Sequence, residues 1–553
     1  MKLIKNINLI LPDKVIENGS IEFDQEIEGI YKTDMSRDNE YEEIIDGQGG
    51  YLSPGLINIH IHGAGGHDTM EASYQALDTM SETVAQHGVT GFLPTTMTMS
   101  EEEIKDALKN IENVKEKGVS GAEILGANVE GPFISPDNKG AQDEKNIIPP
   151  DFSLISNYLD LVKLITIAPE RDGAKEFIEK VTEKGIVASV GHSVASMEDV
   201  NKAKHWGLSH ATHLFNAMTG LHHRNPGIVG AVLLSNITSE LIADYIHVNP
   251  SVLRLVTEMK DTEDIILITD AMEAAGLEDG EYELGGQKVT VKDGSARLSD
   301  GTLAGSVLTM NKAVKNMYNA ANLPLNKVIN MATLNPARVI NLDHRIGKLA
   351  EGYKADLTLF DENLEVESVY NSGEQIVWIG RRTNMNFNIF NNNENNNKRK
   401  DNKVNIYSPL AGEIVSLEKV PDKAFSQKMV GEGLAIKADS NILYSPVSGK
   451  VVKLFSTNHA LGITTNENID VLIHIGIDSI KLEGKGFEAF IEEGQEVSKG
   501  DKLISIDWDA LEGNIPSLLT PVVITNFDEI GEIKNRATDK INTGDILFTV
   551  ELK

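Results

Sequence analysis

The 553-residue sequence contains no cysteine, so it forms no disulfide, and any bound metal must have nitrogen and oxygen ligands. Positive charge is scarce, and the formal net charge of −32 argues against nucleic acid or an anionic membrane as a partner. No apolar run is long enough to span a membrane, and residues 1–7 are too polar for a signal peptide. We therefore expect a cytoplasmic protein that binds small molecules or basic protein surfaces.

The length predicts two or more domains. Residues 1–53 contain short apolar segments between polar turns, which is typical of a small β domain. Apolar strands then alternate with helical segments such as 73–87 and 100–118, the second of which begins with the capping box Ser100–Glu103. Eight strands at this spacing predict a (β/α)8 barrel. The predicted strands are 56–63, 90–96, 124–130, 164–170, 186–192, 210–215, 240–244 and 265–270.

Metal-binding side chains recur at the ends of these strands. His60 and His62 alternate on the first strand, so they point to the same side, about 7 Å apart along the strand. Four further residues are Glu130, His192, His213 and Asp270, at the ends of the third, fifth, sixth and eighth strands. Any one of them alone fits a structural role, such as a helix cap or a core histidine. Together, at the face where barrel enzymes carry their chemistry, they predict a divalent-metal site.

Several motifs, in order, resemble the N-acetylglucosamine-6-phosphate deacetylases of the amidohydrolase superfamily. They are PGLINIHIHG at 54–63, EGPF at 130–133, GHS at 191–193, THLFNAM at 212–218, ITDAM at 268–272, LAGS at 303–306, TLNPA at 333–337 and GYKADL at 352–357. The resemblance implies a multidomain protein. Its barrel would comprise residues 54–344, and residues 1–53 and 345–383 would form one small flanking β-sandwich.

This family resemblance also implies roles for individual residues. One or two divalent ions, which the sequence does not distinguish among Zn, Fe, Mn and Co, would be bound by His60, His62, Glu130, His192, His213 and Asp270. Asp270 would also be the catalytic proton shuttle. An amino-sugar phosphate would be bound by Gln142, Asn216, Ala217, Arg224 and His247. A homodimer through the barrel is expected. A different amide or a deaminated base is an alternative substrate, although the phosphate ligands Arg224 and His247 disfavour a base.

Three positions depart from the pattern of many family members. Asn128 and Gln142 each stand where a histidine is common, and Tyr245 replaces a glycine in the sequence ADYIH. These departures concern the shape of the sugar pocket. Asp270 and the predicted metal ligands keep the family's residue types, so the predicted reaction is unchanged.

Residues 384–403 are rich in asparagine and predict a linker, with a root-mean-square span of roughly 25 Å if it is flexible. Residues 404–553 contain closely spaced β-prone segments with turns at 408–412, 445–449 and 493–494, which predict an all-β sandwich or barrel. Two histidines lie among these segments, His459 and His474. In an apolar strand, a lone histidine is most often a core residue.

This last region resembles the glucose-family IIA domain of the bacterial sugar phosphotransferase system. The matching segments are 420–422, 430–433, 457–460, 471–478, 484–487 and 519–523. The resemblance implies that His474 is phosphorylated, with His459 as its catalytic neighbour. The partners would be the histidine phosphocarrier protein and a sugar-specific IIB domain, with membrane contact only indirectly, through the transporter. An apolar rim of Phe425, Val430 and Ile475 would dock them. Alternatively, this module is a regulatory interaction domain that no longer passes phosphate on.

Overall fold

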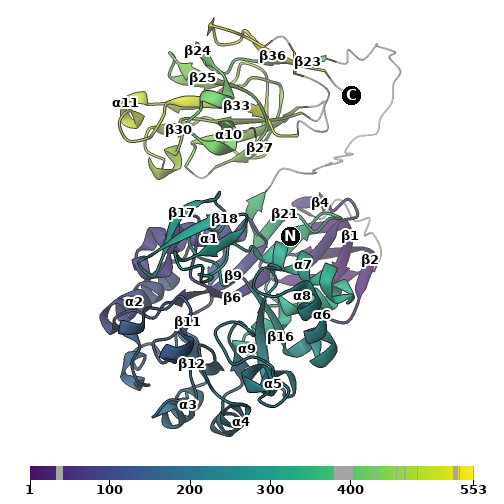
Figure 1. Ribbon diagram of the computed structural model, residues 1–553. Coiled ribbons are helices and arrows are strands. Elements are labelled where there is room, and N and C mark those ends of the chain that lie inside the picture. The colour runs from purple at the N-terminus through teal and green to yellow at the C-terminus, as the bar shows by residue number, and fades with distance from the viewer. Residues whose placement is uncertain are drawn as a thin grey trace. The chain divides into compact units, whose positions relative to one another are not determined.

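The computed structural model describes residues 1–32, 41–378 and 403–551, except 427, 429, 456, 466–468, 483, 527–532 and 535. The chain divides into two compact units, residues Met1–Asn386 and Phe387–Lys553 (Figure 1). The predicted linker 384–403 lies outside the described residues except at Lys403. Within the described part of the chain, no helix has the length and apolar character needed to cross a membrane.

A parallel barrel forms the centre of the first unit, which confirms the predicted fold class. Its strands, in order around the barrel, are β6 (Leu56–Ile61), β9 (Val89–Thr96), β11 (Ala127–Glu130), β12 (Val162–Ile167), β13 (Val187–Val190), β14 (His210–Ala211), β15 (Thr238–Ile242) and β16 (Ile265–Ile268). A parallel bridge from Ile61 to Ala271 connects the last strand region back to the first. The barrel therefore brings all eight carboxyl ends to one face.

Helices surround the barrel (Figure 1). They are α1 (Tyr74–Ala85), α2 (Glu101–Lys117), α3 (Ala174–Thr182), α4 (Met197–Trp206), α5 (Gly227–Leu233), α6 (Pro250–Met259), α7 (Met310–Ala321), α8 (Leu325–Met331) and α9 (Leu334–Val339). In α2, the buried residues Ile104, Leu108 and Ile111 recur at helical spacing. The predicted Ser100–Glu103 capping box is present at its start.

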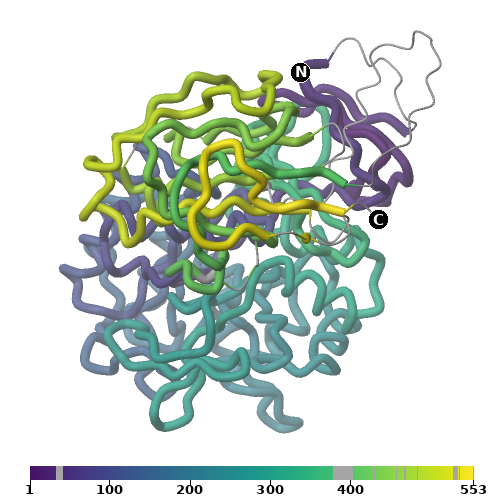
Figure 2. The backbone as a smooth tube through the Cα atoms, turned by 90° about the horizontal axis from the view of Figure 1, so that it is seen from above, coloured from purple at the N-terminus to yellow at the C-terminus, as the bar shows by residue number. Residues whose placement is uncertain are grey.

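A second sheet in this unit combines residues from both sides of the barrel sequence. Its strands are β1 (Lys2–Ile10), β2 (Val15–Phe23), β3 (Ile27–Tyr31), β4 (Glu43–Asp46), β5 (Tyr51–Pro54), β20 (Leu357–Phe360), β21 (Val366–Asn371) and β22 (Glu374–Trp378). β20 pairs antiparallel with β5, so Leu357 lies opposite Pro54. Their buried side chains share one core with those of β1 and β2. Figure 2 shows the purple N-terminal strands as a lobe at one side of this unit. The barrel sequence is thus inserted between two strands of this sheet.

A small three-stranded sheet follows the last barrel strand. It consists of β17 (Gly280–Leu284), β18 (Gln287–Lys292) and β19 (Ser295–Arg297). Its inner face packs on Met97 and Met272, next to the carboxyl ends of the barrel strands.

The second unit is built mainly of antiparallel strands, as predicted. Its largest sheet contains β31 (Glu496–Val497), β27 (Gly449–Leu454), β28 (Ala460–Thr465), β29 (Asp470–His474), β33 (Leu519–Ile524), β25 (Glu432–Ala438), β24 (Gly412–Val415) and β35 (Lys540–Ile541). Two smaller sheets contain β23 (Lys403–Tyr407), β36 (Ile546–Glu551) and β34 (Ile533–Lys534), and β26 (Ile442–Tyr444), β32 (Lys502–Ile506) and β30 (Phe487–Ala489). Two short helices, α10 (Lys423–Ser426) and α11 (Trp508–Leu511), lie between strands.

Candidate metal centre and phosphotransfer site

The six predicted metal ligands meet at the carboxyl end of the barrel. His60 and His62 lie on β6, and Glu130 is the last residue of β11. His192, His213 and Asp270 lie just beyond β13, β14 and β16. The sequence had predicted them inside strands, so the predicted strand ends are wrong here. Each of these three has a left-handed backbone, with φ of 46°, 31° and 50°. This conformation is unfavourable for residues with a side chain and persists where surrounding contacts hold it, which is typical of functional sites.

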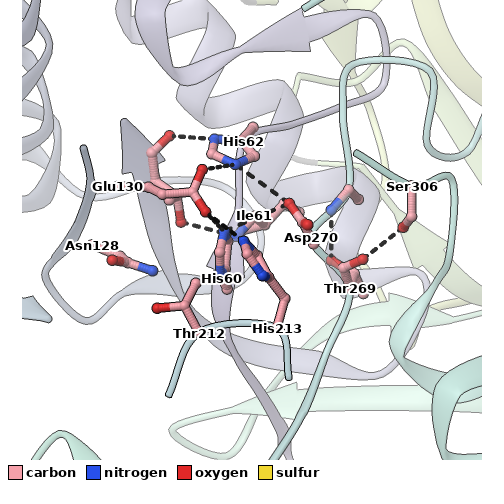
Figure 3. A network of polar contacts seen from close by, with 12 residues as sticks. His60, Ile61, His62, Asn128, Glu130, Thr212, His213, Thr269, Asp270 and Ser306 are labelled. Atoms are coloured by element: carbon pink, nitrogen blue, oxygen red, sulfur yellow. Dashed lines mark hydrogen bonds and ion pairs between the residues drawn. The ribbon is translucent and has the colours of Figure 1, made fainter. Parts of the chain in front are cut away.

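Their donor atoms form two groups, each with its members within 4.8 Å of one another: His60, His62 and Asp270, and Glu130, His192 and His213. The Glu130 carboxylate, from the second group, faces His60 and His62 of the first (Figure 3). Its Oε1 lies 3.0 Å from His213 Nε2 and 3.3 Å from His192 Nε2. Its Oε2 lies 3.3 Å from His62 Nε2. The two oxygens of Glu130 thus reach histidines of both groups, and Glu130 would be a ligand for a divalent ion bound there.

The other ring nitrogen of three histidines is held by the protein. Nδ1 of His62 donates to the Thr95 carbonyl at 3.2 Å, and Nδ1 of His192 donates to the Asn138 carbonyl at 3.2 Å. Nδ1 of His60 donates to Glu240 Oε2 at 2.9 Å. A proton on Nδ1 directs each Nε2 toward the shared centre, which is the arrangement that a metal-ligating histidine needs.

The electrostatics follow from burying imidazoles and carboxylates together. Burial lowers the pKa of His60 and His62, but the neighbouring carboxylates outweigh it. They raise the pKa of His60 well above its usual value and that of His62 to about 9. Burial raises the pKa of Glu130 and Asp270, but the histidines outweigh it and lower both, that of Glu130 strongly. Such carboxylates remain ionised and attract a cation.

The donor set fits the predicted divalent metal. Among the described residues, the buried Nε2 of His60 has no hydrogen-bond partner, as expected for an atom whose partner is an ion. All donors are imidazole nitrogens or carboxylate oxygens, the ligands of zinc, iron, manganese and cobalt sites.

A cavity of about 640 Å³ opens onto this centre, large enough for a sugar phosphate. The predicted substrate ligands Gln142, Asn216, Ala217 and His247 all line it. Nδ1 of His247 donates a hydrogen bond to Asp244 Oδ2 at 2.6 Å. The His247 Nε2 atom is thereby left for a ligand. Arg224 is exposed and is not among the residues lining the cavity.

Gln142 has contacts that the sequence did not predict. Its amide nitrogen donates to Glu130 Oε2 at 2.6 Å, and its oxygen accepts from the Thr98 backbone N–H at 2.8 Å. It therefore orients the central carboxylate from the cavity wall. Two cationic side chains that line the cavity, Lys139 and Arg297, were also missed, since neither lies in a motif.

The other two residues that depart from the family pattern are Asn128, which is buried, and Tyr245, which has a strained backbone. Asn128 donates from its amide to the Ile59 carbonyl at 3.1 Å, inside the barrel wall. Tyr245 has a left-handed backbone with φ of 68°, and its hydroxyl donates to the Asn316 carbonyl at 2.7 Å, on α7. A glycine would adopt this conformation without strain.

In the second unit, His459 and His474 face each other with ring centroids 5.0 Å apart. Nδ1 of His474 donates to the Gly476 carbonyl at 2.7 Å, which leaves the Nε2 lone pair free. Nδ1 of His459 lies 2.5 Å from the Thr457 hydroxyl. Burial lowers the pKa of His474, and burial together with His474 lowers the pKa of His459 to about 4. Both rings are therefore neutral near pH 7, as a nucleophilic imidazole must be.

The predicted apolar rim is wrong in part. Ile475 is wholly buried and Phe425 is 6% exposed, so both belong to the core, although the Phe425 ring contacts His474 at 5.5 Å. Neighbouring residues of an extended chain point to opposite sides, so Ile475 faces the core when His474 faces the site. Exposed apolar side chains are found instead at Ile480 and Phe490.

A closed parallel barrel with four histidines and two carboxylates at its carboxyl face defines a metal-dependent hydrolase of the amidohydrolase type. Residues 51–400 match the amidohydrolase family, and the chain belongs to it. Residues 404–530 match the family described as phosphoenolpyruvate-dependent sugar phosphotransferase system, EIIA 1.

Named relatives cover the first unit. The chain is 40% identical over 372 residues to N-acetylglucosamine-6-phosphate deacetylase of Bacillus subtilis (strain 168), covering 66% of this chain and 94% of the relative. It is 37% identical over 329 residues to N-acetylgalactosamine-6-phosphate deacetylase of Escherichia coli O157:H7, covering 58% and 87%. The crystal structure of N-acetylglucosamine-6-phosphate deacetylase from Thermotoga maritima matches with a TM-score of 0.62 and 35% identity, covering 68% of this chain and 99% of that one.

Proposed function

We propose that this protein hydrolyses the acetamide of N-acetylglucosamine 6-phosphate to give glucosamine 6-phosphate and acetate. The observation that carries this proposal is a sugar-sized cavity with a His/carboxylate centre and His247 in its wall. The barrel of residues 54–344 carries the reaction, and the β domain of residues 1–53 and 345–383 supports it. Residues 384–403 link it to a phosphohistidine carrier of residues 404–553.

In this proposal, one or two divalent ions would be held by the six residues at the carboxyl face of the barrel, His60, His62, Glu130, His192, His213 and Asp270. A bound divalent cation supplies Lewis acidity and an acidified water molecule. Asp270 takes the proton of the attacking water and delivers it to the departing amine. Both of its contacts with His60 and His62 use Oδ1, at 3.5 and 3.4 Å, so Oδ2 is available for the proton. The lowered pKa of Asp270 keeps it ionised as a base before water attack.

The substrate phosphate requires cationic and N–H donors. We place it at His247, which Asp244 orients, and at the loop of Asn216 and Ala217. Arg224 is exposed on a single chain, so we propose that it reaches this subsite from the second copy of a homodimer. Its planar guanidinium suits a phosphate.

Subunit complementation tests the role of Arg224. Arg224→Ala and Asp270→Asn chains should each be poorly active alone. When they are unfolded and refolded together, mixed dimers should regain activity, because one site then has both an intact Asp270 and an intact Arg224. Failure of the mixture to exceed the sum of its parts would place Arg224 in its own chain's site.

The overall reaction is tested by measuring acetate release from N-acetylglucosamine 6-phosphate, with N-acetylgalactosamine 6-phosphate and unphosphorylated N-acetylglucosamine as comparison substrates. We expect the highest kcat/KM with the first. Preference for the galactose epimer would keep the reaction and change the substrate, in line with one relative's name. Equal rates with the unphosphorylated sugar would contradict the phosphate subsite.

For the second unit, we propose that His474 Nε2 accepts a phosphoryl group and passes it to a sugar-specific IIB domain. The neutral, hydrogen-bonded pair His459–His474 supports this role. The donor would be the histidine phosphocarrier protein, which obtains phosphate from phosphoenolpyruvate in the cytoplasm, where we therefore place the protein. Contact with the membrane would occur only through the transporter.

A further inference from the structure

Glu240, on β15, is a wholly buried carboxylate outside the predicted metal-ligand set. A buried carboxylate is unfavourable unless it is fully hydrogen-bonded, so its contacts indicate its role. We propose that Glu240 is a positioning residue of the metal centre, which orients His60 for one ligand group and fixes the backbone of His213 for the other. The inference deepens the proposed hydrolase function and rests on its metal centre.

One oxygen of Glu240 contacts both ligand groups. Oε2 accepts from His60 Nδ1 at 2.9 Å and from the backbone N–H of His213 at 3.0 Å. A carboxylate only accepts, so the proton must sit on Nδ1 of His60. In the neutral ring that a metal requires, the lone pair of His60 is therefore on Nε2, the buried atom that has no hydrogen-bond partner among the described residues and faces Glu130 and Asp270.

The contact with His213 acts on the backbone. His213 has a φ of 31°, which only surrounding contacts maintain. The bond from its N–H to Glu240 is one such contact, and it holds the turn that places His213 Nε2 3.0 Å from Glu130. Loss of Glu240 therefore affects ligands from both groups at once.

The other oxygen is fixed from the neighbouring strand. Nε2 of His210, on β14, donates to Glu240 Oε1 at 3.3 Å. The second ring nitrogen of His210 lies 2.6 Å from the Thr238 hydroxyl, at the start of β15. With three donors on two oxygens, the carboxylate is held in one orientation, and it spans from β15 to β6 across the barrel interior.

Three substitutions of Glu240 distinguish a role in orienting the metal ligands from a role in supplying negative charge. Glu240→Gln keeps an acceptor oxygen at the same reach but removes the charge. Glu240→Asp keeps the charge but is one methylene shorter, so it does not reach His60. Glu240→Met keeps the length and removes both properties. Ile242→Val, a buried change two residues along the same strand, is the packing control.

The measurement is a titration of metal-free protein with Co²⁺, followed by its visible absorption and by elemental analysis. Orientation by Glu240 predicts that the Met and Asp variants bind Co²⁺ about 10- to 100-fold more weakly, the usual effect of losing a group that orients a ligand. The Gln variant should stay within about tenfold of wild type, and its Co²⁺ spectrum should be retained. Ile242→Val should match wild type.

A higher Co²⁺ affinity in Glu240→Asp than in Glu240→Gln would overturn the proposal. The role of Glu240 would then be to supply negative charge to the centre and not to orient the ligands. Unchanged binding in Met or Asp, or equal weakening by Ile242→Val, would also overturn it. If the Met variant does not fold, as judged by circular dichroism, the comparison of Gln with Asp still decides. Since no substrate is present, a protein that binds Co²⁺ normally but releases no acetate refutes the proposed function and leaves this inference intact.

Discussion

The two units each gather histidines at one site, but they surround them differently. In the barrel, His60 lies against Glu240, Asp270 and Glu130, and His62 lies against Asp270 and Glu130. These carboxylates raise the pKa values of both histidines despite burial. In the second unit, His459 and His474 lie against each other, a hydroxyl and a backbone carbonyl, and burial lowers their pKa values. The neighbours therefore decide the chemistry. Carboxylates make a cation site, and neutral donors and acceptors leave an imidazole that can attack phosphorus.

The difference between the two sites would disappear if His474 of the second unit did not act as a nucleophile. His474→Ala should abolish phosphorylation in a relay driven by phosphoenolpyruvate, because it removes the Nε2 atom that is proposed to accept the phosphoryl group. Acetate release should change by less than about twofold if residues 384–403 form a flexible tether, since such a tether transmits no defined geometry. Radiolabelling and deacetylase kinetics on the same preparation check both points.

His459→Ala is the matched variant: it should still be labelled, and its transfer to a IIB domain should slow. A change in KM or kcat of the barrel on phosphorylation, without transfer to IIB, would contradict the carrier proposal and favour the regulatory alternative.

The barrel half of the comparison depends on Glu130. Glu130→Gln should lose bound metal and at least ~10³-fold in kcat, since several kcal/mol of charge stabilisation disappear with the ion. Elemental analysis and acetate release measure the two effects. Glu176→Gln, an exposed change on α3, is the control and should behave as wild type. Full metal content in Glu130→Gln would remove Glu130 from the centre.

Asp270→Asn should separate proton transfer from metal binding. The ligand group of Glu130, His192 and His213 stays intact, so at least one ion should remain bound. The rate constant kcat should fall by at least ~10²-fold, the usual effect of losing a general acid–base group. Near-normal turnover with metal retained would assign the proton shuttle to another residue.

The opposite pKa shifts predict opposite pH responses of the two units. In the second, the pKa of His459 is about 4 when folded and 6.5 in the reference state, so only the unfolded form gains a proton between these values. Its stability should therefore fall by about 1–2 kcal/mol between pH 7 and pH 5. In the metal-free barrel, the pKa of His62 is about 9 when folded. Its contribution to stability is present below pH 6.5 and is lost as pH rises toward 9.

Calorimetry of the protein in chelator at pH 5, 7 and 9 follows the two unfolding transitions. His459→Gln should flatten the acid loss of the second unit and leave the barrel transition unchanged. If the stability of both units changed in the same direction with pH, the result would contradict the proposed electrostatic difference between the two sites.

Local patterns predicted much of this molecule. Alternation on β6 placed His60 and His62 on one side, and capping residues located the start of α2. Strand ends were less accurate, since His192 and Asp270 follow their strands in a left-handed backbone that apolar patterning does not reveal. The role of Glu240 depends on a contact with a residue 180 positions earlier in the sequence, and no local signal encodes such a contact.

The sheet that joins β5 to β20 has a consequence for synthesis of the chain. When β1–β5 leave the ribosome, the edge of β5 has no partner until residues 357–360 have been added. At ~5–20 residues per second, the intervening chain takes on the order of 15–60 s. During that time an unpaired strand edge is exposed to other nascent chains. The barrel must therefore be made within a half-built domain, and that domain is complete only once β20 has followed the barrel.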